Sequence, residues 1–527
     1  MSAAPEQASS VPPEMLSAAE IQHRASRGAL WTALHVSVSL PLNVFVTAVT
    51  ARALGVAGYG RLSYLIVVFA ILQQATDFGF TSAVVQWGSA ARAAGDLGTL
   101  RQHLSRATAF HVLAQAPLVV VATFVVLAKE GIVISCGFAA MSAVFLYASG
   151  ASLALVLDQR NDLLARIALV CNVATQGAVL ATVLLARSPI AVLFARAATS
   201  LLPALVALVV VRRPLLVAVL RPMSLKRLPN GFRAFALYSW GASLMALLVY
   251  SRSEILILEW VGSAKAVGLF SLAFGISQQM TGPVDAATAP LIPATAGLVS
   301  AHPDRVSEAV ARAIRISALL AGILTSCAAP LVFALYSLVY GNSYRTSAWA
   351  FLGLAVVSTL QTALSPVNVL ASALRLGRRM FLANLVALIV DSALAFGLIP
   401  LLSIWGAVIA NAVGQVVALV MLIRAVSGAR SGLRPATVVR ALSPWWSALP
   451  AFALATFAVA ALQSQWLGLV LVVPIGASLY VLFLRVGRAG ITPADAQVLT
   501  RAVPLRLRSV ALTLSQLVTT RGGTCGA

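Results

Sequence analysis

The feature that most constrains this chain is a series of long apolar runs that recurs along the whole sequence. Fourteen stretches are almost free of charge, and at about 20 residues each is long enough to cross a bilayer as a helix. Since lipid offers the backbone no hydrogen-bond partners, such runs are expected to be membrane-spanning helices. We therefore predict an all-α polytopic membrane protein with about 14 transmembrane helices. The predicted spans are 29–51, 62–86, 107–128, 131–156, 167–187, 189–211, 234–258, 267–292, 313–340, 347–373, 381–401, 404–424, 445–462 and 467–485.

The composition excludes most other classes of protein. Hydrophobic residues make up 60% of the 527 residues and charged residues only 10%, whereas soluble domains are about 25% charged. A soluble enzyme and a disordered chain are therefore excluded. An outer-membrane β-barrel is excluded as well, because its strands alternate polar and apolar residues. The cysteines form no CxxC pair and no Cys/His cluster, so we predict neither a metal site nor a cofactor.

The basic residues predict how the chain is oriented. With the N-terminus inside, the inner segments carry 29 Lys and Arg residues and the outer loops carry 6. Positive charge gathers in cytoplasmic loops, so both termini are predicted to be cytoplasmic. The same bias accounts for the net charge of +22 without a nucleic-acid partner. The loops are too short for a nucleotide-binding or extracytoplasmic catalytic domain, so an enzyme is not predicted.

The two halves of the chain share a pattern that indicates an internal repeat. Gly60 matches Gly268, and the same offset of 208 residues carries Asp77 onto Asp285. Transporters are often built from such repeats. The predicted organisation is a cytoplasmic N-tail at 1–28, an N-lobe at 29–212, a basic cytoplasmic linker at 213–233, a C-lobe at 234–424, a helix pair at 445–486 and a cytoplasmic C-tail at 487–527.

Short motifs in both halves resemble the polysaccharide (O-antigen and exopolysaccharide) flippases of the multidrug/oligosaccharidyl-lipid/polysaccharide exporter superfamily. The motifs are Arg52-x-Leu-Gly55-x-x-x-Tyr59-Gly60, Asp77-Phe-Gly79, Gly268-Leu-Phe270-Ser271 and Ala373-Leu-Arg-Leu-Gly377-Arg378. The resemblance implies two six-helix lobes in a V, with the last two helices added outside. It also implies a transporter of the bacterial inner (plasma) membrane that flips an undecaprenyl-diphosphate-linked oligosaccharide from the cytoplasmic to the outer leaflet by alternating access.

We also predict further partners, and two alternatives for the function stay open. The partners would be a proton or sodium ion, membrane lipids, and polysaccharide polymerases or glycosyltransferases. An ion-coupled drug or metabolite antiporter and a lipid II flippase of the same superfamily remain alternatives for the function.

Charged residues inside the predicted spans are the candidates for the site, because a charge in lipid is costly and usually functional. Cations suit a diphosphate, so the two arginines are predicted to bind substrate, together with the glutamate. The three aspartates are predicted to bind the coupling ion. For each residue the simpler alternative is a structural ion pair or a snorkelling side chain. The six residues are Asp77, Arg196, Arg252, Glu254, Asp285 and Asp391.

Asp285 and Asp77 differ in their predicted surroundings. Asp285 stands beside Gly282-Pro283, and Pro290 and Pro293 follow. These residues predict a discontinuous helix of the kind that forms ion sites in transporters. Asp77 has only Gly79 nearby and is predicted to cap or brace its lobe. His111, at the third span, is interpreted as a hydrogen-bonded packing residue.

Overall fold

The computed structural model describes residues 18–158, 160–225, 228–249, 253–288, 305–374, 376–429, 432–462, 465–493, 495–497 and 519. In these residues the chain is helical, apart from loops and one isolated bridge between Ile491 and Thr519. Eleven of the described helices are long and apolar enough to cross a membrane. The all-α, multi-pass prediction is therefore confirmed, whereas the count of fourteen is not.

The helices pack into two compact units. Unit 1 comprises Met1–Ser39, Leu72–Ala178 and Phe194–Trp240, and unit 2 comprises Leu40–Ile71, Val179–Leu193 and Gly241–Ala527. Four helices have residues in both units: α1 (Ala18–Asp77), α6 (Asn161–Ala186), α7 (Pro189–Val210) and α9 (Phe232–Leu247). The predicted lobe boundaries stay a prediction.

Unit 1 is completed by a run of consecutive helices. They are α2 (Phe80–Ala93), α3 (Leu97–Phe110), the π-helix η1 (His111–Gln115), α4 (Ala116–Val126), the 3₁₀-helix η2 (Ala128–Glu130), α5 (Ile132–Leu157) and the short α8 (Arg213–Leu220). A buried core of mostly aliphatic residues joins α2, α3 and α5, with Phe80 stacked on Phe110 at 4.3 Å between ring centroids.

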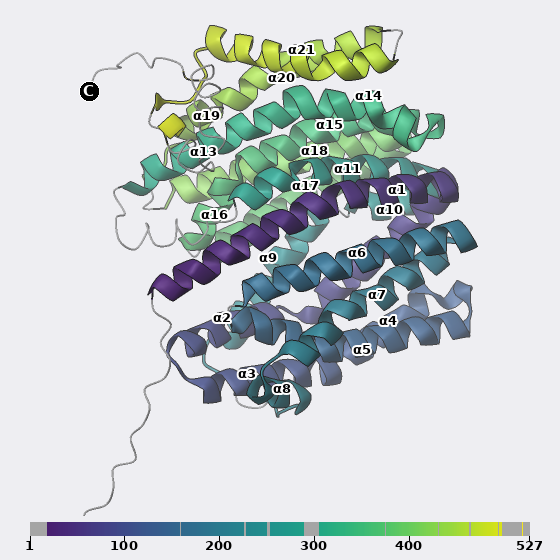
Figure 1. The fold of residues 1–527 in the computed structure, drawn as a ribbon, viewed down its shortest axis with the longest axis vertical. Coiled ribbons are helices and arrows are strands. Elements are labelled where there is room, and N and C mark those ends of the chain that lie inside the picture. Colours follow the sequence, from purple (N-terminus) through teal and green to yellow (C-terminus); the bar gives the residue numbers. More distant parts are fainter. Residues whose placement is uncertain are drawn as a thin grey trace, which may run out of the picture. The chain divides into compact units, whose positions relative to one another are not determined.

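Unit 2 holds the remaining helices, which Figure 1 shows from teal to yellow. Within it α17 packs along α18, α11 along α15 and α20 along α21. The helices are α10 (Ser253–Val261), α11 (Ala264–Thr288), α13 (Val306–Ile323), the π-helix η5 (Leu324–Ala328), α14 (Ala329–Tyr340), the 3₁₀-helix η6 (Asn342–Tyr344), α15 (Arg345–Ala363), α16 (Ser365–Ala373), α17 (Gly377–Leu402), α18 (Ile404–Ser427), α19 (Pro435–Ala441), α20 (Ser443–Ala461) and α21 (Gln465–Val486).

Three predicted spans differ from the observed helices. The first two spans lie largely in α1, which kinks at Gly55 because this residue has φ 66° instead of a helical value. The described residues of the seventh span, 234–258, lie mainly in α9 and α10, and residues 250–252 between these helices lie outside the described residues. Neither α9, α10 nor α11 is among the eleven helices that meet the length and hydropathy criteria for a span.

The predicted break is absent at Gly282-Pro283, whereas Pro290 and Pro293 lie outside the described residues. α11 runs as one helix through Gly282 and Pro283 to Thr288. In a membrane helix, neighbouring groups can satisfy the carbonyl that a proline leaves free, so a Gly-Pro pair need not end the helix. The break lies instead at the other aspartate. α1 ends at Asp77, and Phe78 (φ 46°) and Gly79 (φ 68°) are left-handed before α2 begins.

The repeat-related glycines Gly60 and Gly268 lie at one helix crossing. A Cβ on Gly60 would stand 1.8 Å from the carbonyl oxygen of Ala264, and a Cβ on Gly268 would stand 2.1 Å from that of Val56. Only glycine lets α1 and α11 approach this closely, as in small-residue crossings of membrane helices. The crossing explains why both halves carry glycine at this position.

Both halves also contain a π-helix at the same place in the order of elements. η1 runs into α4, whose second residue is Pro117, and η5 runs into α14, whose second residue is Pro330. Proline has no N–H, so the carbonyl four residues earlier loses its α-helical donor and the turn can widen. A 3₁₀-helix and a long helix follow each time. This order is what an internal repeat predicts.

Contacts in loops and at the ends of helices agree with the sides that the charge count assigns to them. In unit 1, Asp158 is 3.4 Å from Arg92 and 3.5 Å from Arg212, all in predicted inner segments. In unit 2, Tyr344 donates to the carbonyl of Ala51 at 2.9 Å, and Arg52 donates to the carbonyl of Leu338. The residues of each pair lie on a common side, as predicted. That the basic side is cytoplasmic stays a prediction.

Candidate functional site

Two fully buried carboxylates meet inside unit 2. Glu254 is on the first turn of α10 and Asp391 is in the middle of α17, and both have an exposed fraction of 0%. The hydroxyl of Ser253 joins them, since it donates to Asp391 Oδ2 at 2.5 Å and lies 3.3 Å from Glu254 Oε2. Two adjacent anions repel strongly in a medium of low dielectric constant. The pair is therefore suited to hold a proton or a small cation.

A polar ladder on α18 supports this pair. Asn411 donates to Glu254 Oε1 at 2.6 Å, and Gln415, one turn further on, donates to Asn411 Oδ1 at 2.7 Å. Gly414 allows the approach of α17, because a Cβ there would stand 2.7 Å from the Cβ of Asp391. We refer to Ser253, Glu254, Asp391, Asn411 and Gln415 as the carboxylate cluster.

Two oxygens of the carboxylate cluster have no hydrogen-bond partner among the described residues. They are Asp391 Oδ1 and Gln415 Oε1, both buried. Carboxylate and amide oxygens are the ligands that hard cations prefer. Among the described residues no group of three or more His, Cys, Asp or Glu side chains is placed to hold a metal ion. The cluster could therefore take a proton, or a monovalent cation that uses amide and hydroxyl oxygens as well.

Asp77 belongs to a second polar network, in unit 1. Thr81 donates to Asp77 Oδ1 at 2.5 Å, and His111 Nε2 lies 3.4 Å from the same hydroxyl. On the other side of the ring, Ser149 lies 3.1 Å from His111 Nδ1. Because His111 is the first residue of the π-helix η1, the widened turn sits where the ring meets the aspartate network. π-Bulges are frequent at functional sites.

The left-handed turn after Asp77 explains how that network is built. A Cβ on Gly79 would stand 2.0 Å from the carbonyl of Ala236, so α9 packs directly against the turn. Trp240 on the same helix donates its indole N–H to the carbonyls of Gln74 and Ala75, at 3.0 and 3.1 Å. The Asp-Phe-Gly motif is therefore a fixed helix break.

The other predicted site residues are placed as follows. Asp285 is exposed on α11 and accepts a hydrogen bond from Thr362 at 3.2 Å. Arg196 is exposed on α7, and Arg252 lies outside the described residues. The structure brings together Glu254 and Asp391, which the sequence analysis had assigned to different roles.

Sequence reasoning missed most of the polar partners of these acids. Ser253, Asn411 and Gln415 were not singled out, and His111 was interpreted as a packing residue only. The spacing of Asn411 and Gln415 is the signal that was available, because two amides four residues apart in an apolar run share one helix face. The pairing with Glu254 had no local signal.

Comparisons with known proteins agree with this architecture. The family model described as "Polysaccharide biosynthesis protein" matches residues 25–299. The structure of the lipid II flippase MurJ in an inward closed conformation is similar, with a TM-score of 0.64 and 11% identity over 86% of this chain and 98% of that one. A mutant of the Vibrio cholerae MATE transporter VcmN has a TM-score of 0.54 and 16% identity over 78% of this chain and 97% of that one.

An inward-facing multidrug resistance MATE transporter of the MOP superfamily is similar as well. Its TM-score is 0.51, with 15% identity over 75% of this chain and 97% of that one. The search of curated proteins found no match. At these identities the solved structures establish a shared fold.

Proposed function

Because the chain belongs to the polysaccharide biosynthesis protein family, we propose that it is a flippase for an oligosaccharide carried on undecaprenyl diphosphate. It moves this lipid from the cytoplasmic to the outer leaflet of the bacterial inner membrane by alternating access, for the synthesis or export of a polysaccharide. The family match supports the polysaccharide, and the multi-pass fold shared with MurJ and MATE transporters supports transport. The structural observation that carries the proposal is the carboxylate cluster, which an inert helical scaffold would not require.

The carboxylate cluster is the proposed site of ion coupling. A proton or sodium ion between Glu254 and Asp391 removes their repulsion and lets α10 and α17 stay close. Release of the ion leaves two anions that favour separation of these helices. A ligand that binds one arrangement better than another shifts the balance between them. This proposal moves Glu254 from substrate binding to ion coupling, beside Asp391.

The remaining charged residues keep their proposed roles. Arg196 and Arg252 are each proposed to bind the diphosphate, for which the planar guanidinium offers paired donors. Asp77, with His111, and the exposed Asp285 are further candidates for coupling. Both chain termini are proposed to be cytoplasmic.

Transport by purified protein in proteoliposomes tests the coupling proposal. Asp391→Asn and Glu254→Gln keep shape and hydrogen-bonding capacity but remove the titratable groups. We expect folded protein with at least tenfold slower flipping of a labelled undecaprenyl-diphosphate oligosaccharide and little response to an imposed proton or sodium gradient. Asp158→Asn is the matched control, because Asp158 is also buried but pairs with Arg92 and Arg212. Wild-type gradient dependence in both cluster variants would remove the coupling role.

The substrate is tested separately. Mass spectrometry of a deletion strain should show an undecaprenyl-linked oligosaccharide accumulating in the membrane. Arg252→Ala should abolish its export at normal protein levels, and Arg252→Lys should restore part of it, since an ammonium group lacks the paired donors. Uptake of lipid II or of a cationic drug by the same proteoliposomes, without flipping of the oligosaccharide, would favour the alternative transporters instead.

The proposed partners are the enzymes before and after the flipping step. Glycosyltransferases supply the lipid-linked oligosaccharide on the cytoplasmic side, and a polymerase consumes it on the outer side. Membrane lipids surround the helices throughout. Crosslinking in native membranes, followed by mass spectrometry, should recover these enzymes with the wild-type chain, and their absence would restrict the function to flipping alone.

A further inference from the structure

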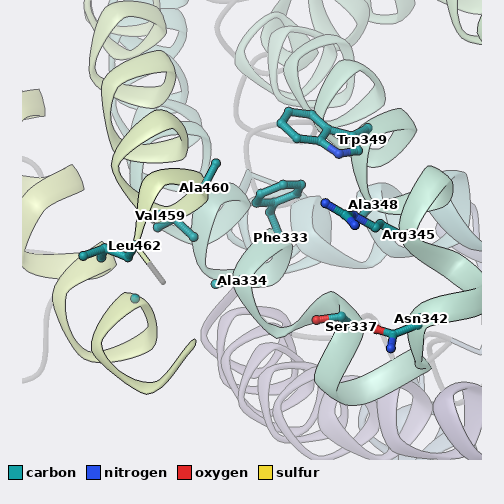
Figure 2. A pocket seen from close by; sticks show the side chains of 11 residues that line it. Phe333, Ala334, Ser337, Asn342, Arg345, Ala348, Trp349, Val459, Ala460 and Leu462 are labelled. Atoms are coloured by element: carbon teal, nitrogen blue, oxygen red, sulfur yellow. The ribbon is translucent and has the colours of Figure 1, made fainter. Parts of the chain in front are cut away.

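A crevice of about 390 Å³ lies in unit 2, where the turn between α14 and α15 faces α20 and the start of α21. Figure 2 shows Arg345 and Trp349 on one side of it and Val459 and Ala460 of α20 on the other. Ser337 and Asn342 form its polar floor next to the turn. The volume is in the range of ordinary small-molecule sites.

The polar side chains of the crevice are available to a ligand. Ser337, Asn342 and Arg345 make no side-chain hydrogen bond or ion pair with any described residue. A guanidinium has five N–H donors and carries its charge at any physiological pH. Arg345 also begins α15, whose N-terminus has no side-chain cap. Charge and helix dipole therefore act together in favour of an anion here.

An apolar trough continues from the crevice. It has a volume of about 350 Å³, runs between α15 and α20, and shares Trp349 and Ala460 with the crevice. Leu352 and Phe452 line its walls further along. Trp349 stacks edge-on against Phe333, with 4.8 Å between ring centroids, and 43% of it is exposed. Such half-exposed tryptophans gather at the level of lipid headgroups.

We propose that the crevice and the trough together bind one anionic glycerophospholipid. Its phosphate lies at Arg345, its polar head at Asn342 and Ser337, and one acyl chain along the trough past Trp349. The cationic side chain matches the phosphate ester of such a lipid, and the continuous apolar trough matches its long acyl chain. The lipid joins α14 and α15 to α20 and so holds the last helix pair against the rest of unit 2. In the orientation proposed above it belongs to the outer leaflet, and the site does not depend on what the protein transports.

Native mass spectrometry of the full chain with added lipids tests this site. Phosphatidylglycerol should bind in preference to phosphatidylcholine with the same acyl chains. Arg345→Gln should weaken phosphatidylglycerol about tenfold or more, as the loss of a charge-assisted hydrogen bond implies. The control is Arg187→Gln, which removes an exposed arginine that does not line the crevice. Equal loss in both variants would show general charge attraction and overturn the proposal.

The apolar half of the site has its own test. Ala460→Trp fills the junction of crevice and trough and should weaken phosphatidylglycerol binding at least tenfold. Leu454→Trp is the control, since Leu454 is 48% exposed on the same helix and lines neither cavity. Unchanged lipid binding in Ala460→Trp would exclude the trough. Arg345→Gln and Ala460→Trp act at exposed positions on different helices. If one of these two variants fails to fold, the other still tests the proposal.

Competing ligands identify the occupant. Glycerol phosphate, which has the head but no chain, should fail to displace phosphatidylglycerol at equal concentration. If glycerol phosphate does displace phosphatidylglycerol, the crevice binds anions in general and the phospholipid proposal is wrong. Undecaprenyl phosphate should compete no better than phosphatidylglycerol, and clearly tighter binding of the polyprenyl lipid would assign the crevice to the carrier and overturn the phospholipid proposal.

Discussion

The crossing of α1 and α11 allows a sharp test, because α11 carries two glycines whose surroundings differ. Gly268 and Gly275 both lie inside α11, seven residues apart. A Cβ on Gly268 would stand 2.1 Å from the carbonyl oxygen of Val56, whereas a Cβ on Gly275 meets no atom within 4 Å. The same substitution, glycine to alanine, should therefore have opposite effects at the two positions.

The magnitude follows from these distances. At Gly268 the colliding atom is backbone, so it cannot move as a side chain would, and the two helices must separate by more than an ångström. Overpacking of this kind costs about 1–3 kcal/mol and sometimes more, and a backbone collision belongs at the upper end. At Gly275 alanine only raises helix propensity, which is worth about 0.5–1 kcal/mol. We expect a difference of about 3–4 kcal/mol in the free energy of unfolding.

Thermal unfolding in detergent, followed by intrinsic tryptophan fluorescence, measures this difference. Gly268→Ala should melt well below the wild-type protein, and Gly275→Ala should melt at or slightly above it. Gly60→Ala, on the other helix of the crossing, should behave like Gly268→Ala, since its Cβ would stand 1.8 Å from the Ala264 carbonyl. Equal melting of the two α11 variants would refute the claim that α1 and α11 are in backbone contact.

Three further predictions concern a latch, a network and the orientation. The latch is the ion pair of Asp495 with Arg315, in which the buried carboxylate, 0% exposed, accepts a hydrogen bond from Arg315 at 2.8 Å. Burial alone would raise the pKa of Asp495. Hydrogen bonds from Arg315 and Thr492 and the charge of Arg315 outweigh burial and hold this pKa below its usual value of about 4. The latch should therefore be intact above pH 4 and weaken as the pH falls through the lowered pKa of Asp495, which hydrogen exchange at 491–497 should report as faster exchange. In Asp495→Asn the same segment should exchange at least tenfold faster already at neutral pH. Protection that does not change with pH in the wild-type protein would contradict this prediction. Thr81→Val removes the donor to Asp77 and should lower the unfolding free energy by about 1.5–3 kcal/mol, while Thr175→Val, whose hydroxyl bonds only its own helix, should cost less than half as much. Reporter fusions after residue 225 should give a cytoplasmic signal and fusions within 341–345 an external one, and an external signal at 225 would reverse the topology.

The class of fold could be predicted from sequence because it depends on local properties. A run of about 20 apolar residues must become a helix in lipid whatever surrounds it, and the distribution of arginine predicts which loops share a side. The contacts of Asp158 and of Tyr344 agree with that grouping. The match of Gly60 with Gly268 was also visible in the sequence, although not that the two helices carrying them cross there.

Helix breaks could not be predicted reliably, because they depend on what packs against them. Gly282-Pro283 looked like a break and is helical, whereas Asp77-Phe-Gly79 looked unbroken and contains one. The carbonyl of Ala236 presses against Gly79, and the indole of Trp240 takes up the carbonyls that the turn leaves free. These partners come from a helix more than 150 residues away in the chain.

The sequence by itself determined a multi-pass helical protein with costly charges inside its membrane helices. Only the tertiary structure decided which of those charges meet. Glu254 and Asp391 stand far apart in the chain, and their role changes once Ser253 joins them and Asn411 closes the cluster from a third helix. The physical reason is that the cost of a buried carboxylate is a local property of the sequence, while its relief by a proton, an ion or a hydrogen bond depends on groups that packing brings from elsewhere.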